Sequence, residues 1–155
     1  MITVADKIHV SDPCYDELYL GTTLDAREGR WVANVTHIQD SWGIYVAVLE
    51  VRHVDFLNRP LDFERNSILG VDSGQMSVFP FEAYPKMDAY TPEWDEWYKK
   101  VCKATLDTPD YWGYAQNGVV SSTGYGDGGY ELEVAYSNGK AIAVRIQFIE
   151  DDGEF

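Results

Sequence analysis

Three short segments combine acidic, hydroxyl and glycine residues in patterns that could do chemistry. They read SDPCY at residues 11–15, GVDSGQ at residues 70–75 and SSTGYGDGGY at residues 121–130. Each places an aspartate beside small polar residues at the end of an apolar run, which predicts a turn at a strand end. If the turns converge, Asp12, Asp72 and Asp127 would form an oxygen-rich site for a divalent metal. The alternative is three independent turns whose side chains cap their own backbones.

A metal at these aspartates would imply hydrolytic chemistry. A bound divalent ion lowers the pKa of its water and orients a phosphate or acyl group, so a metal-dependent hydrolase using Asp12, Asp72 and Asp127 is one functional hypothesis. The chain has no D-x-D-x-D-G loop, and spacing alone does not specify a metal. We therefore expect no cofactor, with a divalent metal as the open alternative.

The third segment also matches the pattern G-x-G-x-x-G at residues 124–129. A dinucleotide-binding loop needs a helix directly after these glycines, because the helix N-terminus holds the pyrophosphate. Here another strand is predicted to follow, and the lysine of a Walker loop is missing. The glycines are therefore expected to permit positive φ angles in a tight turn, or to let a ligand approach the backbone closely.

Binding of a small nucleotide-like ligand is a second hypothesis for the same segments. Tyrosine rings in or near the turns could stack on a base, and glycine amides could hold phosphate. An anionic ligand would also need a local cation, for which Lys7, Lys140 and Arg145 are candidates. The candidate ligand-binding residues are Asp12, Tyr15, Asp72, Ser73, Gln75, Ser122, Thr123, Tyr125, Asp127 and Tyr130.

The two cysteines bear on nucleophilic chemistry and on the compartment. Cys14 follows a proline in a predicted turn, and a nucleophilic role would need a histidine such as His9 in contact with it. Cys102 falls on the apolar stripe of a predicted helix and is expected in the core. The residues MITVADKIHV do not resemble a signal peptide, so we expect a cytoplasmic protein with reduced thiols. A Cys14–Cys102 disulfide stays open at this stage.

The charge balance limits the classes of partner. Twelve Lys and Arg against twenty-six Asp and Glu give a net charge of −14. Direct binding to nucleic acid or to an anionic membrane is not expected, because phosphate contacts need clustered cations. The acidity fits a protein partner with a basic surface or an acidic metal site, or serves only solubility. Eleven Tyr and five Trp suit a β-rich core and also binding surfaces.

These segments must be positioned by a mainly β fold. A chain of 155 residues predicts a single domain over residues 1–155. Apolar and β-branched runs predict strands at 7–10, 19–24, 31–38, 44–54, 68–71, 76–79, 118–122, 130–136 and 140–149. Residues 44–49 are apolar at every position, so both faces of that strand are expected to be covered. We predict an α+β fold, with an antiparallel sheet or sandwich of about eight strands and one packed helix at about 91–106.

Two local elements can be specified further. Thr91 is a good N-cap, Pro92 suits the first helical turn, and apolar residues then recur at helical spacing. In the last hairpin, a three-residue loop at 137–139 would keep apolar side chains on one face. That register pairs Tyr130 with Ile146, Leu132 with Val144, Val134 with Ile142 and Glu131 with Arg145.

The motifs SDPCY, GVDSGQ and SSTGYGDGGY, with the closing hairpin ELEVAYSNGKAIAVRIQF, resemble an uncharacterised family of small bacterial and phage proteins. The resemblance supplies no activity and implies a cytoplasmic setting in bacteria or their phages. With the acidity and the aromatic content, it leads us to expect a non-enzymatic binding protein. In a phage, that protein would inhibit a host defence system by acting on a protein with a basic surface or on a nucleotide signal.

Overall fold

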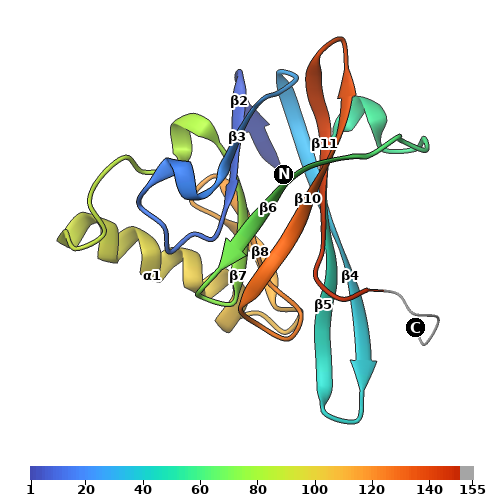
Figure 1. Ribbon diagram of the computed structural model, residues 1–155. Coiled ribbons are helices and arrows are strands. Elements are labelled where there is room, and N and C mark those ends of the chain that lie inside the picture. The colour runs from blue at the N-terminus through green and yellow to red at the C-terminus, as the bar shows by residue number, and fades with distance from the viewer. Residues whose placement is uncertain (151–155) are drawn as a thin grey trace.

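The computed structural model describes residues 1–150, which form two packed β-sheets and one α-helix (Figure 1). Sheet A has the strand order β1-β4-β5-β11-β10-β6, and sheet B has the order β3-β2-β7-β9-β8. The strands are β1 (Ile2–Val4), β2 (Lys7–Ser11), β3 (Thr22–Asp25), β4 (Gly29–Asp40), β5 (Gly43–His53), β6 (Glu64–Val71), β7 (Gln75–Pro80), β8 (Trp112–Ala115), β9 (Gly118–Ser122), β10 (Gly128–Ser137) and β11 (Lys140–Gln147). The expected α+β class is confirmed, with eleven described strands where about eight were predicted.

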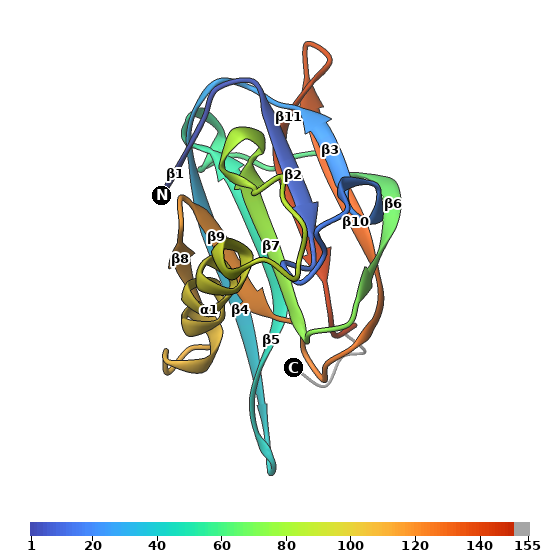
Figure 2. The ribbon, with the colours of Figure 1, turned by 90° about the vertical axis from the view of Figure 1, so that its left-hand side faces the viewer.

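The main core lies between the two sheets and follows strand alternation. On β10, Leu132 and Val134 are buried in this core, while Glu131 and Glu133 lie on the outer face of sheet A and pair with arginines. On β9, Val119 faces the core between the sheets, and Val120 faces a second cluster beneath the helix. Sheet B is therefore covered on both faces, by sheet A and by the helix (Figure 2).

The helix α1 (Pro92–Leu106) begins where the sequence predicts. The Thr91 side chain accepts a hydrogen bond from the Trp94 amide at 3.3 Å, and Pro92 lies in the first turn. Trp94 and Val101 are buried against sheet B. Cys102 was predicted in the core but is half-buried at its margin, where its sulfur lies 3.5 Å from the side-chain nitrogen of Gln75. Within residues 1–150, no helix has both the length and the apolar character needed to cross a membrane.

The predicted register of the last hairpin is wrong by two residues. Ser137 pairs with Lys140, so the turn contains only Asn138 and Gly139, at φ 53° and 77°. A bulge at Ile142 then shifts the register and restores the match of apolar faces. The observed pairs are Leu132 with Ile146, Val134 with Val144 and Glu133 with Arg145.

The hairpin of β4 and β5 extends beyond the rest of the sandwich at its turn (Figure 1). Ile44 is 44% exposed, and Tyr45 is only half-buried. The expectation that both faces of residues 44–49 are covered is therefore wrong at Ile44 and Tyr45, because the hairpin here projects beyond sheet B. The hairpin tip presents apolar side chains to solvent.

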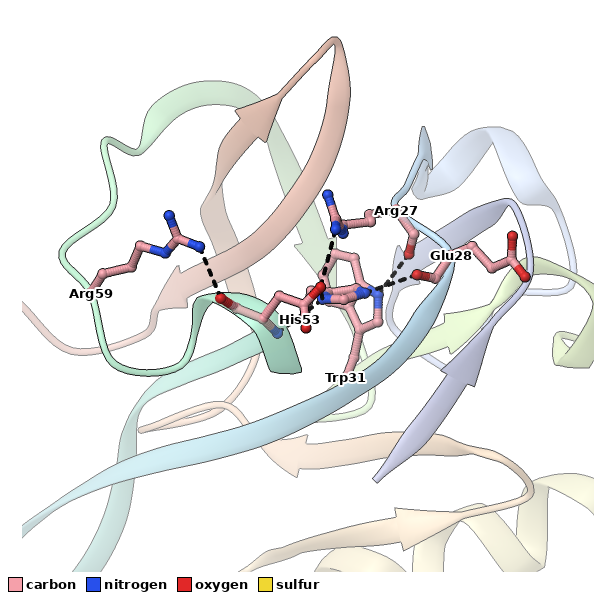
Figure 3. A network of polar contacts seen from close by, with 6 residues as sticks. Arg27, Glu28, Trp31, His53 and Arg59 are labelled. Atoms are coloured by element: carbon pink, nitrogen blue, oxygen red, sulfur yellow. Dashed lines mark hydrogen bonds and ion pairs between the residues drawn. The ribbon is translucent and has the colours of Figure 1, made fainter.

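At its other end, β5 continues into the short helix η2 (Val54–Phe56), which is fixed by a polar network (Figure 3). His53 donates from Nε2 to the Glu28 carbonyl oxygen at 2.8 Å, and its Nδ1 accepts from the Asp55 amide at 3.1 Å. Arg27 and Arg59 both donate to Asp55, at its carboxylate and its carbonyl oxygen. Within residues 1–150, no buried side-chain nitrogen or oxygen of this network lacks a hydrogen-bond partner, so we assign it a structural role.

Candidate functional site

The three sequence motifs meet at one end of the sandwich. The SDPCY turn follows β2, the GVDSGQ turn joins β6 to β7, and the glycine-rich turn joins β9 to β10. Ser11 pairs with Ser77 and Gln75 with Ser122, which places these strand ends side by side. The Thr123 amide donates to the Gly74 carbonyl oxygen at 3.1 Å, so the second and third turns also touch.

Asp12 is the residue that joins the first two turns. Its side chain is fully buried and accepts four hydrogen bonds. Oδ2 accepts from the amides of Asp72 and Ser73 at 2.7 and 2.8 Å, and Oδ1 accepts from the Cys14 amide at 2.8 Å and from the Ser73 hydroxyl at 2.5 Å. We call Asp12, Cys14, Asp72 and Ser73 the Asp12 cluster. Both carboxylate oxygens of Asp12 accept two hydrogen bonds each, and these bonds hold the two loops together.

The metal site at Asp12, Asp72 and Asp127, which the sequence left open as an alternative, is not supported by the arrangement of residues 1–150. No group of three or more His, Cys, Asp or Glu side chains in residues 1–150 is arranged to hold a metal ion. Asp72 instead accepts a hydrogen bond from the Tyr15 hydroxyl at 2.6 Å, and Asp127 is exposed. The motifs converge, as the metal hypothesis required, but the Asp12 carboxylate accepts from backbone amides and the Ser73 hydroxyl, and the Asp72 carboxylate accepts from Tyr15.

The glycine-rich turn owes its composition mainly to backbone conformation. Gly124 and Gly126 have φ angles of 58° and 122°, which glycine adopts without strain. A Cβ on Gly124 would also lie 2.8 Å from the Ile149 side chain. The Gly126 carbonyl oxygen accepts from the Thr123 hydroxyl at 2.8 Å and from the Tyr130 hydroxyl at 2.6 Å. Tyr130 and Thr123 therefore stabilise the turn from within, and Tyr125 projects from it with 66% of its surface exposed.

Gln75 from the second motif is buried and makes polar contacts with residues of α1. Gln75 accepts from the Thr105 hydroxyl at 2.8 Å and lies 3.5 Å from the hydroxyl of Tyr98.

Burial, followed by the negative charge of Asp12, raises the pKa of the Cys14 thiol above its ordinary value. Since the thiolate is the nucleophile, this environment argues against Cys14 as a nucleophile. Both cysteines are free thiols in the structure.

The three cations predicted to serve a phosphate ligand lie away from the glycine-rich turn. Lys7 is the first residue of β2, at the end opposite to the SDPCY turn, and its nitrogen lies 4.0 Å from the Asp25 carboxylate. Lys140 is the first residue of β11, next to the turn of the last hairpin. Arg145 is paired with Glu133 on the outer face of sheet A at 3.2 Å. The geometry therefore gives no support to phosphate binding at the glycine-rich turn.

A second surface lies where the tip of the β4–β5 hairpin meets the glycine-rich turn. A hollow of about 300 Å³ here is lined by Trp42, Gly43, Ile44, Tyr45, Tyr111, Ser122 and Gly124. Tyr125 lies next to this lining and packs against Tyr45, with the two ring centroids 4.8 Å apart. We call Trp42, Ile44, Tyr45, Tyr111 and Tyr125 the tip surface. Trp42 is its most exposed member at 88%.

Two features show that the tip surface has a defined backbone. Asp40 Oδ1 accepts from the amides of Trp42 and Gly43 at 2.7 and 3.1 Å, which fixes the hairpin turn. Tyr111 has a φ of 62°, which is unusual for an aromatic residue and is the kind of strain that collects at functional sites. Its carbonyl oxygen accepts from the Ser122 amide at 2.9 Å, which ties it to β9.

The sequence predicts only part of the tip surface. Tyr125 is among the expected binding residues, as is Ser122 in the lining of the hollow, whereas Trp42, Ile44, Tyr45 and Tyr111 are not. The available signal was a tryptophan inside a polar hairpin turn, QDSWG, where burial is not expected. The contribution of Tyr111 could not be found from sequence, because it depends on how the segment after α1 packs against β9.

No protein-family model, curated protein or solved structure matches this chain. The resemblance of the three motifs to a bacterial and phage family therefore stays a prediction.

Proposed function

We propose that this chain is a non-enzymatic binding protein that recognises another protein through the tip surface. The observation that carries the proposal is the exposure of Trp42 and Tyr125, at 88% and 66%, on a turn and a loop with defined backbones. Tryptophan and tyrosine are enriched at protein interfaces and supply much of the binding energy there. Large aromatic groups gathered at one exposed place are a mark of such a surface.

Charge indicates the kind of partner. The net charge is −14, and none of the described residues that line the hollow is a lysine or an arginine. Asp40 lies within the hairpin turn, and Asp127 is exposed beside the glycine-rich turn. A partner with a basic surface around an apolar anchor site would complement this arrangement and would be attracted at long range.

The biological setting of the proposal comes from the motifs alone. Their resemblance to phage proteins supports a role in the bacterial cytoplasm as an inhibitor that covers a basic surface of a host defence protein. Expression of the chain in bacteria carrying defined defence systems tests this role. Unchanged phage resistance with every such system would count against it.

The binding function is tested with Trp42→Ser. We expect this change to weaken binding of the purified partner at least about 10-fold, because it removes the largest exposed anchor. The partner is first captured from a bacterial lysate, identified, purified, and titrated calorimetrically from about 0.05 to 0.5 M NaCl. Binding should weaken steeply with salt.

Tyr90→Ser is the matched control, because Tyr90 is 98% exposed and lies outside the tip surface. It should bind the partner like the unaltered protein. Equal binding by Trp42→Ser and Tyr90→Ser would refute the assignment to the tip surface, and affinity independent of salt would refute the basic partner.

A further inference from the structure

We propose that the hollow in the tip surface binds an arginine side chain of the partner protein. This inference rests on the proposed function and names the group that enters the site. It follows from three observations: aromatic rings line the hollow, no lysine or arginine of the described residues lies over these rings, and the Asp40 carboxylate lies beside them.

The rings of the hollow suit a cation. Trp42, Tyr45 and Tyr111 line it, and Tyr125 packs against Tyr45 with the two ring planes at 59°. Rings at different angles around a hollow offer π faces to one bound group, and a cation over such a face is attracted by the ring quadrupole. Tryptophan and tyrosine are the stronger cation–π partners, and a planar guanidinium can also stack on them.

Elsewhere in this chain, cations already cover aromatic faces. The Arg59 guanidinium lies 4.3 Å from the Phe56 ring centroid, and the Arg145 guanidinium lies 4.0 Å from that of Phe63. Among residues 1–150, no lysine or arginine lies over a ring of the tip surface. The exposed rings of Trp42, Tyr111 and Tyr125 thus remain accessible to a cation from outside.

The charge next to the hollow is the negative charge of Asp40, which is opposite to that of a guanidinium. Asp40 uses Oδ1 for the turn amides, while its Oδ2 accepts no hydrogen bond from the described residues. The Gly43 amide that donates to Asp40 at 3.1 Å belongs to a residue that lines the hollow, so the Asp40 carboxylate lies at its edge. An arriving guanidinium would meet aromatic faces and a carboxylate oxygen together.

The size of the hollow favours one side chain. Its volume of about 300 Å³ is at the lower end of ligand pockets, which span about 300–1,000 Å³. The positive φ of Tyr111 is consistent with a ring held at this position for a purpose other than folding.

The test uses small probes that differ in charge and little in shape. N-acetyl-arginine amide and N-acetyl-citrulline amide are titrated into the full chain, and the indole N–H resonance of Trp42 is followed by NMR. That resonance is assigned from the spectrum of Trp42→Phe. We expect the arginine probe to bind at least about 5-fold more tightly than the neutral probe.

Three variants locate the site. Tyr125→Leu keeps an apolar side chain without a π face, Asp40→Asn keeps a turn acceptor without the charge, and Tyr111→Gly keeps the positive φ without the ring. Each should weaken binding of the arginine probe, whereas Tyr90→Leu should not. Equal binding of the two probes, no binding of either, or insensitivity to all three variants would overturn the inference.

The two proposals can fail separately. If Trp42→Ser loses the protein partner but the arginine probe does not bind, the tip surface is an interface and the arginine inference is wrong. If the probe binds as expected but Trp42→Ser retains the partner, the hollow is a cation site and the proposed function is wrong.

Discussion

Replacing Asp12 with alanine is expected to lower the free energy of unfolding by about 4–6 kcal/mol, because four hydrogen bonds to one fully buried charged acceptor are lost together. The part-buried amides of Cys14, Asp72 and Ser73 would lose the acceptor that joins their two loops. Domains are stable by only about 5–15 kcal/mol, so the variant should be close to unfolded at room temperature. Urea unfolding followed by tryptophan fluorescence measures the change.

Asp127→Ala provides the control, because Asp127 is exposed and belongs to the same group of motifs. It should change stability by less than about 0.5 kcal/mol. If Asp12 were instead a metal ligand, its replacement would cost little in metal-free protein, and divalent ions would raise the melting temperature of the unaltered chain alone. That pair of results would restore the hydrolase hypothesis.

Acidification should destabilise the protein through His9. Burial lowers the pKa of this imidazole from 6.5 to about 4, with a smaller effect from the positive charge of Lys86. Between pH 6.5 and about pH 4, His9 is therefore protonated in the unfolded chain but neutral in the folded protein. The stabilisation is complete above pH 6.5 and declines as the pH falls through this window towards 4. The loss reaches about 3 kcal/mol, since each pKa unit corresponds to about 1.4 kcal/mol.

His9→Gln isolates this contribution from the many carboxylates. His9 accepts or donates one hydrogen bond with Thr23 at 2.8 Å and packs edge-on against Tyr84, so the glutamine variant loses some stability at every pH. Its unfolding free energy should fall less between about pH 6.5 and pH 4 than that of the unaltered chain. Parallel curves for the two proteins would show that His9 does not titrate in this window.

Elements with local signals could be predicted from the sequence, and elements that depend on distant packing could not. Thr91 and Pro92 mark the start of α1 because capping acts within one turn. β1 and β8 were missed, since three or four residues carry little alternation and their pairing comes from neighbouring strands. The bulge at Ile142 was missed because this side chain packs with Phe56, which lies far away in the chain.

The candidate site divides in the same way. The three motif turns could be identified as turns, but their convergence through Asp12 depends on the order of strands in both sheets. Their polar residues proved to hold loops together, as Thr123 and Tyr130 do around Gly126. Turn chemistry and site chemistry use the same residue types, so sequence alone could not separate these roles.

The side chains of the tip surface are largely separate from those that hold the fold. Trp42 and Tyr125 bury little area, and Asp40 and the neighbouring glycines set the backbone beneath them. Selection for folding therefore acts only weakly on these two aromatic positions. A lineage that must follow a changing target can exchange them one at a time while Asp12 stays constant. The same separation makes the hairpin tip a suitable place to randomise residues in a library for new targets.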